Sequence, residues 1–146
     1  MSIQIAALQP KDRPAWEVLA RGYKTFYNTP TTDAEYEAVW HRLLARDAIF
    51  ALGAFREERL VGIAHYLFHV NVWGPVGCYL QDLYTADDAR GEGVGRALIE
   101  AVAAEARARG AARYYWLTHE TNAVARALYD KVARYAGFIR YEFGDL

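Results

Sequence analysis

A glycine loop at the start of a long helix constrains the fold of this chain more than any other sequence feature. Residues 90–95 read RGEGVG, follow the apolar segment Cys78–Tyr84, and open an alanine-rich helix that reaches Arg109. Glycine permits tight turns and the close approach of a ligand to the backbone, and a helix N-terminus presents unpaired N–H groups to an anion. Strand, loop and helix together predict an α/β fold with a phosphate-binding turn.

Two better-known phosphate loops do not fit this segment. A Walker motif needs Gly-Lys-Ser/Thr after its spacer, whereas Gly95 is followed by Arg96 and Ala97. The dinucleotide fingerprint needs a third glycine where Arg96 stands, and too little chain follows for a doubly wound sheet. Both types of nucleotide-binding site are therefore excluded.

Hydrophobic periodicity divides the rest of the chain into strands and helices. Asp12, the run Thr31-Thr32-Asp33 and Asn122 offer N-cap chemistry to the first, second and last helices. The expected strands cover residues 3–7, 48–55, 60–70, 78–84, 113–118 and 138–143, and the expected helices cover residues 14–27, 33 to about 46, 94–109 and 123–132.

The composition is that of one globular domain, which we expect to span residues 1–146. Hydrophobic residues make up 53% of the chain and charged residues 24%, with a formal net charge of -1. This balance excludes disorder, and the absence of a long basic run argues against nucleic acid as a partner. No apolar stretch is long enough for a membrane span. Cys78 is the single cysteine, which excludes an internal disulfide and suits the cytoplasm.

The loop and the strand before it resemble the GNAT superfamily of N-acetyltransferases. Arg90, Gly93 and Gly95 match its cofactor motif, Arg/Gln-x-x-Gly-x-Gly/Ala. Residues 79–84, YLQDLY, look like the Tyr-Leu-Glu-Asp segment of polyamine and thialysine acetyltransferases and of related histone or small-amine acetyltransferases. The resemblance implies a mixed β-sheet of about six to seven strands flanked by about four helices, with a splay between the two central parallel strands.

The same resemblance implies acetyl-CoA as the co-substrate. Main-chain groups at the end of the strand would pair with the pantetheine arm, the N–H groups of the glycine loop would hold the pyrophosphate, and the cap of the last helix would also touch the cofactor. Because many relatives form dimers, a homodimer is expected. The implied cofactor-binding residues are Leu83, Tyr84, Thr85, Arg90, Gly91, Glu92, Gly93, Val94, Gly95, Arg96 and Asn122.

Tyr129 is the general acid that the resemblance implies. Residues 122–129, NAVARALY, match the family motif that ends in this tyrosine. A phenol beside the departing sulfur can hydrogen-bond to it or protonate it, whereas phenylalanine has no proton to give. Tyr129 is therefore the leading candidate for a catalytic residue.

The group that removes the amine proton is open. A free alkylamine resembles lysine, with a pKa of about 10.4, so it needs a base or a proton-conducting water. Gln81 stands where relatives carry a glutamate that serves as the general base, and an amide does not accept a proton at neutral pH. Asp82 is the adjacent acid, able to bind the substrate ammonium or to route its proton through water. The alternatives are His65, His69 and His119, each interpreted first as polar pocket lining.

The tyrosines, the histidines and the single cysteine bear on where the acceptor binds, on metal binding and on covalent catalysis. Tyr23 and Tyr27 can cradle an ammonium by cation–π contact, although aromatic residues at helical spacing are more often core. His119 is a further candidate on the substrate side. No metal is predicted, because the histidines of the strand over residues 60–70 lack a third ligand at a recognisable spacing. Cys78 is interpreted as a small core residue rather than an acetyl-accepting nucleophile.

These patterns favour direct transfer of an acetyl group to a primary amine. The predicted acceptor is a small amine, polyamine-like or lysine-like. A lysine side chain of a protein is one alternative acceptor. A non-catalytic acyl-CoA-binding module is another interpretation, motivated by the missing glutamate at position 81, and a stand-alone interaction domain is a third.

Overall fold

The computed structural model describes residues 2–146 and divides the chain into two compact units. The first unit ends at Trp116 and holds every strand, whereas the second spans Leu117–Leu146 and holds the last helix. The expectation of a single domain over residues 1–146 stays a prediction. Among the described residues, no helix combines the length and the apolar character that crossing a bilayer requires.

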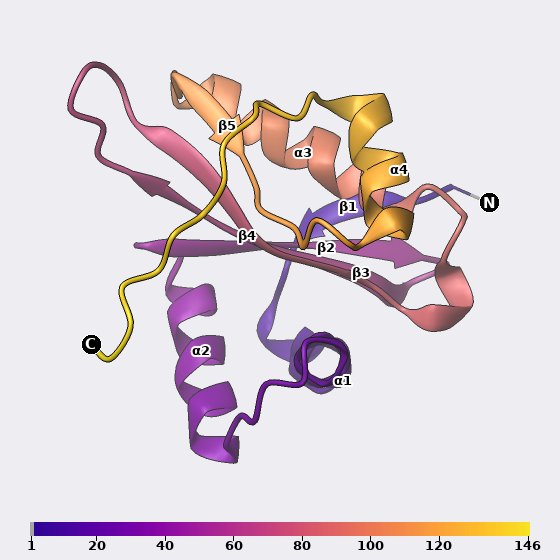
Figure 1. Ribbon diagram of the computed structural model, residues 1–146. Coiled ribbons are helices and arrows are strands. Elements are labelled where there is room, and N and C mark those ends of the chain that lie inside the picture. The colour runs from indigo at the N-terminus through magenta and orange to yellow at the C-terminus, as the bar shows by residue number, and fades with distance from the viewer. Residues whose placement is uncertain (1) are drawn as a thin grey trace. The chain divides into compact units, whose positions relative to one another are not determined.

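The first unit is built on a mixed sheet of five strands in the order β1-β2-β3-β4-β5. The first four strands run antiparallel to their neighbours, and β5 pairs with β4 in parallel. The predicted α/β class and the mixed sheet are confirmed, although the sheet has fewer strands than the expected six to seven. The strands are β1 (Gln4–Ala7), β2 (Ile49–Arg56), β3 (Arg59–His69), β4 (Gly77–Thr85) and β5 (Arg113–Tyr115) (Figure 1).

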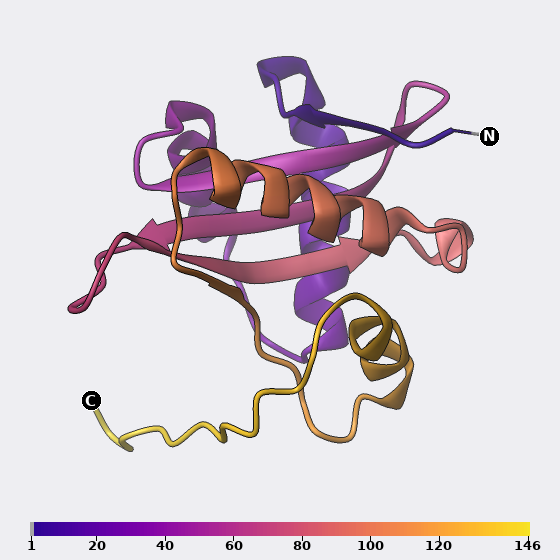
Figure 2. The same cartoon turned by 90° about the horizontal axis from the view of Figure 1, so that it is seen from above.

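Three helices cover the sheet of the first unit. α1 (Arg13–Phe26) and α2 (Asp33–Ala45) lie on one face, and α3 (Val94–Ala108) lies on the other, as Figure 1 and the turned view in Figure 2 show. Their apolar sides are packed inward, so that Trp16 of α1 and Leu98 of α3 are both 0% exposed. Burying a large apolar side chain stabilises a fold by about 1.5–3 kcal/mol. This packing fixes α1 against the sheet, where the candidate site lies.

The helix caps agree with the sequence in one case and differ in another. Thr32 and Glu35 form a capping box at the start of α2, in which Thr32 Oγ1 accepts from the Glu35 N–H at 3.1 Å. Asp12 stands at the N-cap position of α1, as expected, but its side chain makes no capping hydrogen bond to that helix. Asp12 has helical backbone angles at the end of a short 3₁₀ turn (Pro10–Asp12), and its Oδ2 instead accepts from the Gln9 N–H at 2.7 Å.

Cys78 is a core residue, as predicted. Its side chain lies in β4 and is 0% exposed. Burial raises the pKa of the thiol to about 11, against a weaker opposing effect of Arg109. Because the thiolate is the nucleophilic form, a thiol held in its protonated state is unsuited to accept an acetyl group.

The second unit contains one helix, α4 (Ala123–Val132), which Asn122 caps as predicted by accepting the Ala125 N–H at 3.3 Å. The strand expected over residues 138–143 is wrong. Phe138 and Phe143 are 85% and 84% exposed, and the segment pairs with no strand among residues 2–146. Alternating apolar residues supply the two faces of a strand but not its hydrogen-bonding partner, which explains the error. The strand expected over 113–118 likewise ends at Tyr115.

Candidate active site

Strand β4 extends beyond the end of its parallel partner, β5. β4 and β5 are paired only where Gly77–Tyr79 face Arg113–Tyr115, and β4 then continues to Thr85. From Leu80 onward no strand of the described sheet runs along that side of β4. Backbone N–H and C=O groups left there can pair with an extended, amide-containing ligand. This is the splay between parallel strands that the resemblance implies, and Leu83, Tyr84 and Thr85 lie along it.

A β-bulge on the other side of β4 places Asp82. His65 of β3 is opposite Asp82, but the next residue, Tyr66, is opposite Leu80. Gln81 is thus the extra residue in the ladder, and its side chain is exposed. Bulges re-aim the side chains around them and recur beside active sites. Here the bulge sets Asp82 directly across from a histidine.

Asp82 ends a chain of hydrogen bonds that begins on α1. The indole N–H of Trp16 donates to His65 Nε2 at 3.0 Å, and His65 Nδ1 lies 2.8 Å from Asp82 Oδ2. An indole nitrogen only donates, so Nε2 must be the acceptor and Nδ1 carries the proton given to Asp82. These two contacts therefore direct the Nδ1–H of His65 toward Asp82. The sequence analysis did not predict this role of Trp16. The only feature of the sequence that pointed toward it was a histidine on the strand next to that of Asp82.

Asp82 is a largely buried carboxylate that stays ionised. Its side chain is 19% exposed, and that of His65 is 12% exposed. Burial alone pushes the pKa of Asp82 upward, but a hydrogen bond and a charge contribution from His65, with a hydrogen bond from Tyr23 and the charge of Lys24, lower it below the ordinary value. The site thus holds a fixed negative charge at neutral pH, oriented by neighbours on α1 and β3.

Tyrosines surround the carboxylate on the α1 side. Burial and the nearby Asp82 raise the pKa of Tyr23 and, less strongly, that of Tyr27, so both are neutral phenols. The ring of Tyr23 lies 4.8 Å from that of Tyr27 and 6.4 Å from that of Tyr84, centroid to centroid. Gly22 allows this approach, because a Cβ there would lie 2.7 Å from the Tyr84 hydroxyl. We call the set of Trp16, Tyr23, Tyr27, His65 and Asp82 the Asp82 cluster.

The glycine loop has the geometry of an anion site. It joins a 3₁₀ turn (Asp87–Ala89) to α3, and Gly93 is the N-cap residue. Gly91 and Gly93 have φ angles of 79° and 85°, a left-handed conformation that side chains rarely adopt. No atom lies within 4 Å of a Cβ built at either position, so it is backbone conformation that requires glycine. The first N–H groups of α3 are available to a phosphate beside this bare backbone.

Two arginines of the β2–β3 hairpin hold the acidic side chains around the loop. Arg56 Nη1 lies 2.7 Å and 2.6 Å from the two carboxylate oxygens of Glu92, and the Arg56 side chain is 14% exposed. Arg59 pairs with Asp88 at 2.8 Å, where both side chains are exposed. The pairs neutralise carboxylates that would otherwise repel an anion at the helix N-terminus. We call Arg56 and Arg59 the hairpin arginines.

The remaining predicted site residues belong to the second unit. Tyr129 lies on α4 with its side chain half-buried, and its C=O accepts the Ala133 N–H at 2.8 Å. His119 is exposed in the turn before α4, where its C=O accepts the Asn122 N–H at 3.0 Å. The catalytic role of Tyr129, the substrate contact of His119 and the cofactor contact of Asn122 stay predictions.

His69 has a local role on β3. Its Nδ1 donates to the carbonyl of Val70 at 3.0 Å, and its Nε2 lies 3.0 Å from the Tyr115 hydroxyl. The carbonyl can only accept, so Nδ1 is the donor in that bond. Within residues 2–146, no three His, Cys, Asp or Glu side chains are grouped so as to hold a metal ion.

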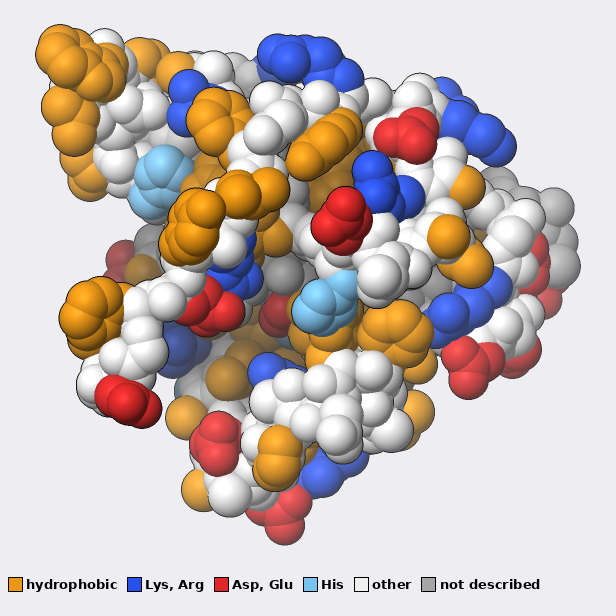
Figure 3. Space-filling model, viewed as in Figure 1, with side chains coloured by type: hydrophobic (Ala, Val, Ile, Leu, Met, Phe, Trp, Pro, Cys, Tyr) orange, Lys and Arg blue, Asp and Glu red, His pale blue; other side chains and the backbone are white. Residues whose placement is uncertain are grey.

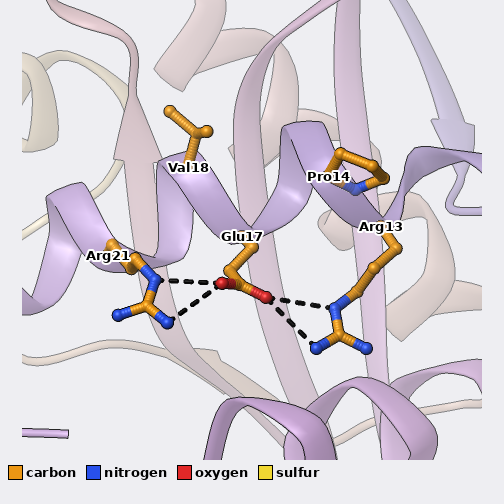
Figure 4. Close-up of a pocket in the computed structure, with 5 residues that line it drawn as sticks. All are labelled: Arg13, Pro14, Glu17, Val18 and Arg21. Carbon is orange, nitrogen blue, oxygen red and sulfur yellow. Dashed lines mark hydrogen bonds and ion pairs between the residues drawn. The ribbon is translucent and has the colours of Figure 1, made fainter. Parts of the chain in front are cut away.

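Two other surface features lie away from this site. Hydrophobic side chains gather at the tip of the β3–β4 loop (Figure 3), where Val72 is 89% and Trp73 94% exposed. A hollow of about 520 Å³ lies along α1 (Figure 4), lined by Arg13, Pro14, Glu17, Val18 and Arg21. Its charges are already paired, because Glu17 bridges the two arginines at 3.1 Å and 3.0 Å. Neither feature shares a residue with the Asp82 cluster or the glycine loop.

Comparison with known proteins agrees with this geometry. Residues 15–133 match the family model described as the acetyltransferase (GNAT) family. The chain is 36% identical over 135 residues to a D-amino-acid N-acetyltransferase of Saccharomyces cerevisiae, covering 90% of this chain and 84% of that protein. It is 26% identical over 114 residues to the thialysine N-epsilon-acetyltransferase of Bos taurus, covering 78% and 67%.

A solved structure extends the match to the fold. An aminoglycoside N-acetyltransferase in complex with a bisubstrate analogue built on CoA has a TM-score of 0.86 to this chain, with full coverage of both chains (100% each). At 15% identity the likeness concerns the fold. The sheet, the splay and the glycine loop therefore belong to a known architecture.

Proposed function

Because this chain belongs to the acetyltransferase (GNAT) family and is an acetyl-CoA-dependent N-acetyltransferase, we propose that its acceptor is a small cationic amine bound at the Asp82 cluster. The observation that carries the proposal is the buried, ionised Asp82 beside the neutral phenols of Tyr23 and Tyr27. A fixed carboxylate with aromatic faces nearby attracts an ammonium group. D-amino acids and thialysine, named for the two relatives, both carry amino groups.

The residues present fit acetyl-CoA. The unpaired edge of β4 at Leu83, Tyr84 and Thr85 suits the amide-containing arm, and the backbone of residues 90–96 suits the pyrophosphate. Asn122 is part of the same proposal. The co-substrate supplies an acetyl thioester: the acceptor nitrogen forms a bond to the acetyl carbon, the C–S bond breaks, and the sulfur leaves with the bonding electrons.

Asp82 is proposed as the group that binds the ammonium and takes up its proton, directly or through water. Its pKa is lowered, so it is a weak base toward a free ammonium. The ammonium must first lose one proton through water, because only the neutral amine has the lone pair that attacks the acetyl carbon. Once that bond forms, the nitrogen becomes far more acidic, and the carboxylate can accept its second proton. Gln81 has no such capacity. Tyr129 is proposed as the acid that protonates the sulfur.

The test of the acceptor class is release of free CoA thiol from acetyl-CoA across a panel of amines. The panel holds polyamines, lysine analogues, D- and L-amino acids and a histone-tail peptide. Release that depends on a small amine, with the peptide inactive, supports the proposal. Turnover of the peptide alone would make a protein lysine side chain the acceptor instead.

The assembly and location of the enzyme are part of the proposal. We propose a homodimer of single-domain subunits in the cytoplasm. The lone buried Cys78 fits a reducing compartment. Light scattering of the purified chain distinguishes a dimer from a monomer directly.

Replacing Arg56 with methionine is expected to weaken acetyl-CoA binding selectively. The variant loses the half-buried pair that fixes Glu92, which leaves an unpaired carboxylate beside the anion site. A loss of about 1 kcal/mol corresponds to a roughly fivefold higher KM for acetyl-CoA. The KM for the amine should stay unchanged. Initial-rate kinetics with each substrate varied in turn measure both constants.

Arg59→Met is the matched control for this variant. The Arg59–Asp88 pair is exposed on both sides, and such pairs contribute about 0–1 kcal/mol. Its effect should therefore be smaller. Equal effects of the two substitutions, or a change confined to the amine, would contradict the role given to Arg56.

A further inference from the structure

The side chain that orients Asp82 is itself oriented from α1. Trp16 is 0% exposed, and its indole N–H reaches His65 Nε2 at 3.0 Å. Trp16 is 49 residues from His65 in the chain, and His65 is 17 residues from Asp82. The three groups come from α1, β3 and β4, so each link joins a different element. Nothing in this line of contacts requires Trp16 to touch either substrate.

We propose that Trp16 is a positioning residue for acetyl transfer, which acts by locking the tautomer of His65. This inference rests on the proposed role of Asp82 at the amine. With Nε2 occupied by the indole donor, His65 has only its Nδ1–H to offer, and that hydrogen points to Asp82 Oδ2 at 2.8 Å. The carboxylate is thereby fixed in place by a directed hydrogen bond.

The lock matters because an unrestrained histidine has two other states. The opposite tautomer puts a lone pair on Nδ1 toward the carboxylate, which is repulsive. The imidazolium cancels the charge that attracts the substrate. Either state requires a proton on Nε2, where the Trp16 donor leaves no acceptor. The indole therefore excludes both states with a single contact.

Other titratable groups around the pair do not replace this contact. On α1 they are Tyr23, Tyr27 and Lys24, and on β4 they are Asp82 itself and Tyr79. Both α1 tyrosines have raised pKa values, and Tyr23 donates a hydrogen bond to Asp82. Lys24 acts on Asp82 through its charge. The donor at His65 Nε2 is the indole N–H of Trp16.

Trp16→Phe tests the proposal, because phenylalanine keeps an aromatic ring but removes the N–H. We expect kcat/KM for the amine to fall about tenfold at neutral pH, with the KM for acetyl-CoA unchanged. Nitrogen-15 NMR of the four histidines, assigned with His65→Asn, should show His65 as the pure Nδ1–H form in the wild type and as a mixture in the variant.

Trp40→Phe is the matched control, since Trp40 packs 5.0 Å from Trp16 in the same aromatic group and is 3% exposed. It should lose packing without changing the His65 tautomer. Should Trp16→Phe fold poorly, His65→Asn supplies a second test. An asparagine amide can donate to Asp82 with no tautomer to lock, so adding Trp16→Phe to it should cost no further activity.

The two ideas fail separately. If Trp16→Phe keeps the pure Nδ1–H form and matches Trp40→Phe in amine kinetics, the tautomer lock is overturned. If Asp82→Asn turns over amines at the wild-type rate while the NMR difference persists, the lock exists but Asp82 does not serve the amine. That second result overturns the proposed role of Asp82 and, with it, the positioning role of Trp16.

Discussion

Asp82→Asn is expected to lower kcat/KM for the amine by about 10²–10³-fold, the range of general base catalysis combined with loss of an ion pair. Asparagine has nearly the same shape, but it carries no charge to attract an ammonium and accepts no proton. The KM for the amine should rise, and kcat should fall. Binding of acetyl-CoA, at the glycine loop and the β4 edge, should not change.

Asp47→Asn is the control for this substitution, because it makes the same chemical change at an exposed turn. Unfolding of each variant is compared at pH 7. The folded pKa of Asp82 is lowered, so its stabilising contribution is present above the unfolded carboxyl pKa of about 3.9 and is lost as the pH falls through the folded value. An Asp82→Asn enzyme within threefold of wild type would remove Asp82 from the mechanism.

Tyr129→Phe is expected to lower kcat about 10²-fold while the dissociation constant of acetyl-CoA stays the same. A thiolate leaving without a proton donor raises the barrier of the step by the amount that general acid catalysis supplies. The phenol acts when the C–S bond breaks, so the loss should appear in kcat more than in KM. Stopped-flow rates and calorimetric binding measure the two quantities independently.

Tyr135→Phe serves as the comparison for Tyr129→Phe. Tyr135 belongs to the same unit and is 66% exposed, with the guanidinium of Arg126 5.6 Å from its ring centroid. Removing its hydroxyl should leave turnover intact. Equal rates for Tyr129→Phe and wild type would assign the proton donor to another group or to water.

Local patterns were sufficient to predict most of the elements. The glycines of residues 90–95 mark the loop because two of them need a left-handed backbone, and Thr32 with Glu35 marks the start of α2. These signals lie within a few residues of the structure they specify. The strand expected over residues 138–143 shows the limit, since a strand depends on a partner elsewhere in the chain.

The arrangement around Asp82 could not be predicted in the same way. The sequence predicts a hairpin of apolar strands, but the bulge at Gln81 decides which residue of β3 faces Asp82. Without it, the two-residue period would misplace the side chains beyond that point. The contact from Trp16 depends on the packing of α1 over the sheet. From the sequence alone, an aromatic residue on a helix is equally consistent with a core position and with a site position.

The two halves of the candidate site, the anion site and the Asp82 cluster, are positioned by different parts of the chain. The anion site is set by α3 and the hairpin arginines, whereas the carboxylate and its tyrosines are set by α1. Substitutions on the inward face of α1 can therefore change which amine is accepted at little cost to the shared thioester donor. Acceptance of the amine and binding of acetyl-CoA can thus be altered independently, by substitutions in different helices.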